Sequence, residues 1–299
     1  MRVNPNYTSD LVNLMDQAQQ AEDNATEQLS TGRRVNLPSD DPAAEAAMVG
    51  ENSQSAAVDQ YTANSDSLTS VLNTADSTLS SVVTLLQKAV SLGVEGADGT
   101  LNQTDLNSIA EEVSGIQSQV LSLANTSYAG QYLFAGTATG TRPYVADSSD
   151  PTQIDYAGNN VQNHVQIGTG LSVASNLPGS SIFSRSGSNV FDALQSLVSA
   201  LQSGDTTSIA AAGTSVSNSL NAVDTAQVFY GNTVNELTTN ETCLSQETLN
   251  ITTYENTLVA SDTATAATDV TQDEAILNAT VEATAQMEQQ DNLLNYIQN

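Results

Sequence analysis

Apolar residues recur at alternating spacings of three and four along both halves of the chain, which is the period of one helix face. The longest stripe runs from Val58 to Ala89, and similar stripes cover 106–123 and 216–258. A heptad stripe of this length needs a partner helix, as in a coiled coil. We expect helices at 7–31, from 42 to the glycine-rich segment 93–99, over the stripe at 106–123, at 190–202, at about 206–261 and at about 269–298.

The first predicted helix has a thin stripe made mostly of alanine. Its members are Tyr7, Leu11, Leu14, Ala18, Ala21 and Ala25. Such a helix is marginal alone in water. Gly32 is placed to end it, and the charges of Arg33 and Arg34 suit the negative end of its dipole.

The second predicted helix has a strong start signal. Pro42 fits the first helical position, where a missing N–H costs nothing. Asp41 can cap the exposed N–H groups, and Asp40 and Glu45 add favourable charge near the helix start.

The periodicity changes near residue 130. Short alternating runs at 153–156 and 161–167 lie between Gly, Pro and Asn residues. This pattern predicts a small β domain at about 136–186. It lies between two helical halves, and helices from the two chain ends are expected to face each other.

The predicted fold is therefore mainly α: a long antiparallel, coiled-coil-like helical rod formed by N- and C-terminal helices, with a small β-rich domain inserted in the middle. We divide the chain into an N-terminal assembly helix and turn (1–41), the N-terminal half of the rod (42–135), the β-rich outer domain (136–186), the C-terminal half of the rod (187–264) and a C-terminal assembly helix (265–299).

Charge is strongly one-sided, with 34 acids, 6 bases and a net charge of −28. Nucleic-acid binding is disfavoured because it requires clustered cations, and docking on an anionic membrane is disfavoured for the same reason. The apolar runs are shorter than the roughly 20 residues of a membrane span. The N-terminus has no apolar core typical of a cleaved signal peptide. The single cysteine, Cys243, excludes an internal disulfide framework.

Two long motifs and one short motif resemble a known family. The segment QLSTGRRVNLPSDDP at 28–42 resembles the N-terminal signature shared by bacterial flagellins and hook-associated protein 3. The segment ANTSYAGQYLFAGT at 124–137 resembles the lead into the outer domain of hook-associated protein 3, and LLNYI at 293–297 is similar to its C-terminus. The resemblance covers roughly 1–145 and 205–299.

This resemblance implies a structural role outside the cell, in the bacterial flagellum, without a cofactor. It implies export through the flagellar type III apparatus without a cleaved signal peptide, and assembly in a ring between the first hook-associated protein and the flagellin filament. It also implies terminal helices that pack with other subunits and a C-terminal region that binds an export chaperone. The matching segment 259–270 lacks the basic residues usual in flagellins, which weakens the flagellin interpretation.

The two terminal helices have weak stripes, so we expect them to pack between subunits, whereas the stripes in 58–123 are expected to pack within one chain. The predicted assembly interface is Leu11, Leu14, Leu29, Ile276, Met287, Leu293, Leu294, Tyr296 and Ile297. The predicted structural motif is Gly32, Arg33, Asp40, Asp41 and Pro42.

Enzymatic and metal-binding alternatives have little support. Cys243 and His164 are the only residues of their types and fall in different predicted domains, so we expect no nucleophile–base pair. One Cys and one His cannot complete a zinc site. Acids at 147–150 could bind calcium, but no EF-hand loop is present, and Gly93, Gly96 and Gly99 lack the lysine of a phosphate-binding loop. Other structural alternatives are a flagellin with a short outer domain and an adhesin-like or phage-tail-like fibre subunit.

Overall fold

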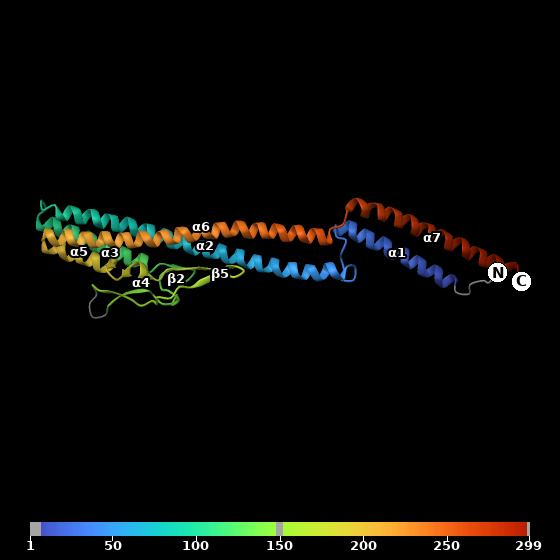
Figure 1. Ribbon diagram of the computed structural model, residues 1–299, viewed down its shortest axis with the longest axis horizontal. Coiled ribbons are helices and arrows are strands. Elements are labelled where there is room, and N and C mark those ends of the chain that lie inside the picture. Colours follow the sequence, from blue (N-terminus) through green and yellow to red (C-terminus); the bar gives the residue numbers. More distant parts are fainter. Residues whose placement is uncertain (1–6, 148–151, 298–299) are drawn as a thin grey trace. The chain divides into compact units, whose positions relative to one another are not determined.

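The computed structural model describes residues 7–147 and 152–297, apart from the side chains of residues 7, 8, 11 and 287–297. Long helices dominate it (Figure 1). The helices are α1 (Tyr7–Thr31), α2 (Pro42–Ala97), α3 (Gln103–Ala124), α4 (Gly179–Ile182), α5 (Val190–Ser203), α6 (Thr206–Val259) and α7 (Thr263–Ile297). The mainly α prediction is confirmed.

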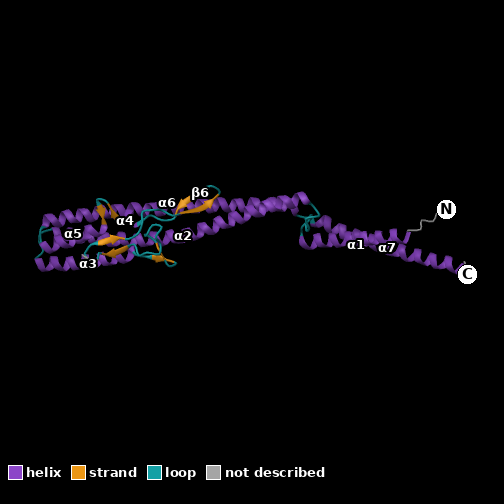
Figure 2. Ribbon diagram, turned by 90° about the horizontal axis from the view of Figure 1, so that it is seen from below, coloured by secondary structure: helices purple, strands orange, loops and turns teal. Residues whose placement is uncertain are grey.

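The strands form antiparallel pairs rather than one sheet (Figure 2). They are β1 (Ser127–Tyr128), β2 (Gln131–Tyr132), β3 (Tyr144–Ala146), β4 (Ile154–Tyr156), β5 (His164–Gly168), β6 (Leu171–Ala174), β7 (Ser184–Arg185) and β8 (Ser188–Asn189). The pairs are β1–β2, β3–β4, β5–β6 and β7–β8. The strand-rich region thus begins before residue 136 and ends after 186, because tight hairpins also flank the segment where the sequence alternates.

The chain divides into two compact units, residues 1–57 with 247–299, and residues 58–246. In the second unit, α2, α3, α5 and α6 share one hydrophobic core. The predicted α2 stripe is confirmed as its centre, since Leu72, Leu79 and Leu86 are fully buried. Asn102 and Asn189 cap the starts of α3 and α5 by accepting hydrogen bonds from backbone N–H groups.

The hairpins pack onto this bundle through aromatic side chains. The Tyr144 ring lies 5.7 Å from that of Phe183, edge to face, and 5.0 Å from that of Phe191 on α5. The Asn125 side chain, just after α3, accepts a hydrogen bond from the Tyr144 N–H and donates one to its carbonyl. These contacts fix the start of β3 on the helical core.

The expected helix break at 93–99 was wrong in its position. Helix α2 continues through Gly93 and Gly96 and ends at Ala97. A Cβ at Gly96 would lie 2.5 Å from a methyl group of Leu201 on α5. Glycine therefore serves close helix packing here, and only Gly99, with φ +70°, lies in the following turn.

In the first unit, α1 packs along α7, and the two helices run antiparallel (Figure 1). The residues that face inward in this pair coincide only in part with the predicted stripes, which were expected to pack between subunits. On α1, Ala21 and Leu14 are exposed, whereas Met15, Ala18 and Ala25 are partly or fully buried. On α7, which begins six residues before the expected start, Ile276 and Ala283 are exposed.

Candidate assembly site

The contact between α1 and α7 is built mostly from small and polar side chains, with a few larger apolar ones. The partly or fully buried positions on α1 are Met15, Ala18, Glu22, Ala25 and Gln28, and those on α7 are Ala266, Val270, Asp273, Leu277, Thr280 and Thr284. Only Ala25 and Ala266 among them are fully buried. Because alanine removes little apolar surface from water, this seam contributes much less burial than a leucine seam would.

Several larger apolar side chains of the same pair face outward. Val12, Leu14 and Leu29 on α1 and Ile276 and Val281 on α7 are 41–56% exposed. Three of the predicted assembly residues, Leu14, Leu29 and Ile276, belong to this set. The side chains of Leu11, Met287, Leu293, Leu294, Tyr296 and Ile297 lie outside the described residues.

The end of α1 is joined to the α6–α7 connection by backbone hydrogen bonds. We call residues 31–41 and 258–262 the clasp. Gly32, with φ +68°, ends α1 and donates its N–H to the Gln28 carbonyl at 2.9 Å. The Arg34 N–H donates to the Val259 carbonyl at 2.7 Å, and the Ser261 N–H donates to the Gly32 carbonyl at 2.9 Å. Arg33 contributes through its backbone, in an antiparallel bridge with Ala260.

The Arg34 guanidinium connects the two halves of the clasp. Its Nη2 donates to Asp41 Oδ2 at 3.0 Å and to the Leu258 carbonyl at 3.0 Å. The expectation that this charge serves the end of α1 was therefore wrong, because Arg34 reaches a carbonyl in the last turn of α6. The Arg34 guanidinium still interacts favourably with a helix C-terminus, but that helix is α6 and not α1.

Asp41 serves as the cap of α2. Its Oδ1 accepts hydrogen bonds from the N–H groups of Ala43 and Ala44, at 3.2 and 3.1 Å, and Pro42 is the first residue of the helix. The hydrogen bond from Ala44 and the one from Arg34 hold the pKa of the Asp41 carboxyl below its ordinary value.

Asp40 stabilises the turn before the helix and not the helix start. Its Oδ2 accepts hydrogen bonds from the N–H groups of Asn36 and Leu37, at 3.0 and 2.9 Å. These bonds, first that from Leu37, lower the pKa of the Asp40 carboxyl. Asp40 was expected to add favourable charge near the start of α2. In the structure it closes the 36–40 turn instead.

Sequence reasoning missed the apolar support of the clasp. Val35, Ala44, Met48 and Val259 form a small buried cluster, with Leu258 packed against it. The signal was the presence of apolar Val35 and Met48 on either side of a polar turn. This cluster holds the clasp in a geometry where its hydrogen bonds are well aligned.

The other candidate residues do not assemble into a site. Cys243 is exposed on α6 and His164 is exposed on β5. The described residues contain no group of three or more His, Cys, Asp or Glu side chains placed to hold a metal ion. The calcium alternative at 147–150 falls largely outside the described residues. None of the described helices combines the length and apolar character that crossing a membrane requires.

Comparison with known proteins identifies the family. The model of the bacterial flagellin N-terminal helical region matches residues 3–139. Flagellar hook-associated protein 3 of Escherichia coli is 34% identical over 230 residues, covering 71% of this chain and 73% of the relative. The chain belongs to the flagellar hook-associated protein 3 family.

Flagellins match a smaller share of this chain. The flagellin of Listeria monocytogenes is 32% identical over 41% of the chain and 43% of its own length. A solved structure described as a flagellar hook-associated protein, from Vibrio parahaemolyticus, has the same fold, with a TM-score of 0.68 and 22% identity over 74% of this chain and 99% of that one. Family membership favours the flagellar interpretation over an adhesin-like or phage-tail-like fibre.

Proposed function

We propose that this protein is a structural subunit of the bacterial flagellum that joins the hook, through the first hook-associated protein, to the flagellin filament. The observation that carries the proposal is the α1–α7 pair, in which several larger apolar side chains face outward. An arrangement of this kind leaves surface for further subunits to bury. The protein acts as a joint and not as an enzyme.

Assembly through the two terminal segments, 1–41 and 265–299, follows from the same observation. Burial of Leu14, Leu29 and Ile276 between subunits would supply the apolar contact that the α1–α7 seam lacks. The clasp would hold α1 and α7 together while they dock. In this division the segments 42–135, 136–186 and 187–264 form the two halves of the helical part and the outer domain.

In this proposal the subunit is exported from the cell in the way that is typical of the family. The chain leaves the cell through the flagellar type III apparatus without a cleaved signal peptide, after its C-terminal region has been bound by an export chaperone. It then assembles with copies of itself, the first hook-associated protein and flagellin. The net charge of −28 keeps free subunits apart before they dock.

The test is a double variant, Leu14→Ser with Ile276→Ser, examined as purified monomer and in cells that lack the native protein. Because both side chains are exposed, the free energy of unfolding of the monomer should change by less than about 0.5 kcal/mol for each site. In cells, filaments should be lost while flagellin and the variant subunit both accumulate in the medium. The matched control, Leu249→Ser, removes a leucine on α6 that is 58% exposed, and should leave filaments intact.

Two results would contradict the proposal. Normal filaments in the double variant would show that the outward apolar residues do not join subunits. In cells with the gene deleted, a bare but complete hook and junction would instead assign this chain to the filament itself, as a flagellin. Measuring the exported variant in the medium separates failure of assembly from failure of export.

A further inference from the structure

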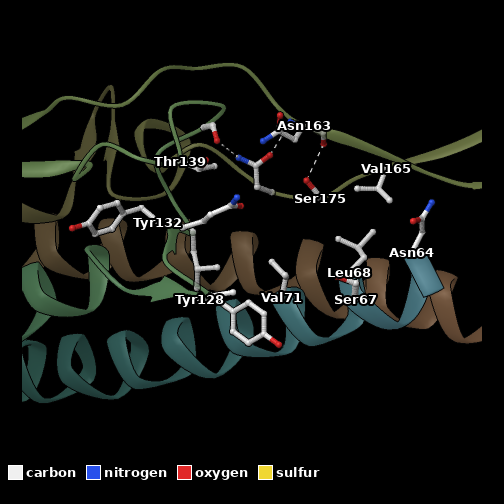
Figure 3. Close-up of a pocket in the computed structure, with 15 residues that line it drawn as sticks. Asn64, Ser67, Leu68, Val71, Tyr128, Tyr132, Thr139, Asn163, Val165 and Ser175 are labelled. Atoms are coloured by element: carbon white, nitrogen blue, oxygen red, sulfur yellow. Dashed lines mark hydrogen bonds between the residues drawn. The ribbon is translucent and has the colours of Figure 1, made fainter. Parts of the chain in front are cut away.

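A cavity of about 410 Å³ lies between α2 and the hairpins of the second unit (Figure 3). Its walls come from three parts of the chain: one face of α2 around Leu68, the hairpin β1–β2 with the segment after it, and the segments that precede β5 and follow β6. The volume is in the range of small-molecule sites. The terminal helices and the clasp are not part of it.

The lining combines an apolar floor with a neutral polar rim. Leu68 and Val71 of α2 lie on one side, and Thr139, Asn163 and Ser175 lie across from them (Figure 3). Among the described residues that line the cavity, none carries a charge at neutral pH. In a chain with 34 acids and 6 bases this composition is informative, because it gives no electrostatic preference for either a cation or an anion.

Several polar groups of the rim are available to a ligand. The side chains of Gln131, Thr139 and Asn163 make no hydrogen bond to any other described residue. An amide offers both donors and an acceptor, and a hydroxyl offers one donor and two acceptors. The rim can therefore pair with a ligand that carries many neutral hydroxyl groups.

Other groups hold the rim in place and are already paired. The Asn176 side chain accepts from the Asn163 N–H at 2.8 Å and donates to the Gly136 carbonyl at 3.2 Å. The Ser175 hydroxyl donates to the Asn163 carbonyl at 3.3 Å. The backbone that carries the free Asn163 amide is thus fixed before a ligand arrives, which reduces the entropy cost of binding.

Two tyrosines of one hairpin lie at the same end of the cavity, but their rings differ in direction. The Tyr128 ring lies near Val71 of α2, whereas the Tyr132 ring points away from the other lining residues (Figure 3). The hairpin turns at Ala129 and Gly130, with φ of +49° and +80°, and Ala129 accepts a left-handed conformation that costs a non-glycine residue free energy. A tyrosine ring offers an apolar face together with a polar hydroxyl. Pyranose sugars have the matching surface, a C–H face bordered by hydroxyl groups.

We propose that this cavity binds a neutral carbohydrate, with Tyr128 stacking on the sugar ring and Gln131, Thr139 and Asn163 pairing with its hydroxyl groups. Tyr128 is opposite Gln131 in the hairpin and is 37% exposed, so its ring is accessible to a sugar at the mouth of the cavity. A charged sugar loses water without gaining a paired charge in such a site, so it binds more weakly than its neutral counterpart. This function is additional to joining flagellar segments and does not depend on that role.

The first test is saturation-transfer NMR on the full chain. The probes are di- and trisaccharides of glucose, galactose, mannose and N-acetylglucosamine, together with an oligogalacturonate and a chitosan oligomer of similar size. At least one neutral probe should give transfer to its ring C–H protons, with weaker signals from the acidic and the cationic probes. Absence of transfer to every neutral probe, or equal transfer to a charged one, overturns the proposal.

Variants then locate the binding site. Tyr128→Ala and Asn163→Ala should each weaken binding about tenfold, which corresponds to about 1.4 kcal/mol. Tyr128→Phe should retain most of the affinity because the ring remains. The matched controls, Tyr254→Ala and Asn232→Ala, remove exposed residues of α6 outside the cavity and should leave binding unchanged.

Gln131→Ala tests the site with a variant that should fold normally. Gln131 is exposed, and its side chain makes no hydrogen bond to a described residue. It should weaken binding while the circular dichroism spectrum stays the same. Unchanged affinity in Gln131→Ala and Asn163→Ala places the sugar elsewhere and overturns the assignment. If hydrogen exchange at these residues slows as the protein concentration rises in the absence of sugar, the cavity is covered by a second copy of the chain. That result would overturn the carbohydrate assignment as well.

Discussion

Helices α1 and α2 share the same three–four spacing of small and apolar residues, yet they use it differently. In α2 the stripe from Leu68 to Ala89 is buried within the chain, and every member is at most 3% exposed. In α1 the inward positions are mostly alanine and polar residues, while Leu14 and Leu29 face outward. Spacing therefore identifies a helix, whereas the size of the residues on each face shows whether the single chain completes its packing.

The largest expected effect comes from removing a leucine of the completed core. Leu79→Ala should lower the free energy of unfolding by about 2–5 kcal/mol, because a fully buried side chain is replaced by a cavity. Urea denaturation of the purified monomer, followed by circular dichroism, measures this loss.

Leu249→Ala is the control for that variant. Leu249 lies on α6 but is 58% exposed, so its truncation should cost less than about 0.5 kcal/mol. Similar losses in both variants would mean that burial in the isolated chain does not separate the two kinds of apolar position, and the contrast between α1 and α2 would lose its basis.

The second effect concerns a tight backbone contact in the hairpin region. Gly136 has φ +71°, and a Cβ there would clash with the Asn159 backbone and side chain. Gly136→Ala should destabilise the second unit by about 1–3 kcal/mol. Gly140→Ala is the matched control, since a Cβ at Gly140 meets nothing within 4 Å. Equal thermal melting points for the two variants would show that the hairpins relax freely on the bundle.

The sequence predicts the helical part of the fold well because heptad spacing and boundary residues are local signals. Pro42 and Gly32 lie at or next to helix ends as expected. The pattern could not show that Gly93 and Gly96 are helical, because what favours glycine at Gly96 is the approach of α5 from about 100 residues away. Tertiary contact there overrides a local breaker signal.

The clasp shows the same limit at the candidate site. Capping of α2 by Asp41 is a local relation, and the sequence predicts it. The bond from Arg34 to the Leu258 carbonyl joins residues 224 positions apart, and no local pattern indicates it. The carbohydrate cavity was not predicted at all, because its lining residues come from separate short segments without a shared motif.

The smallest expected effect is electrostatic and concerns the first unit. Asp41 has a pKa below its ordinary value of 3.8 in the folded protein, owing first to the Ala44 hydrogen bond and then to Arg34. A carboxyl with a lowered pKa stabilises the fold above the unfolded value, about 3.9, and this contribution is lost as the pH falls through the folded value. The clasp should therefore loosen below about pH 4. An NMR titration of the Ala43 and Ala44 amide signals reports the midpoint.

Arg34→Gln separates the two causes of this shift. Removing the guanidinium should raise the Asp41 midpoint toward 3.8 without reaching it, because the hydrogen bonds from the Ala44 and Ala43 N–H groups remain in place. Arg142→Gln is the control, since it removes an exposed arginine of the second unit and should leave the midpoint unchanged. A midpoint unaffected by Arg34→Gln would mean that the ion pair is open in solution. The clasp would then rest on its backbone bonds and on the Val35–Met48 cluster alone.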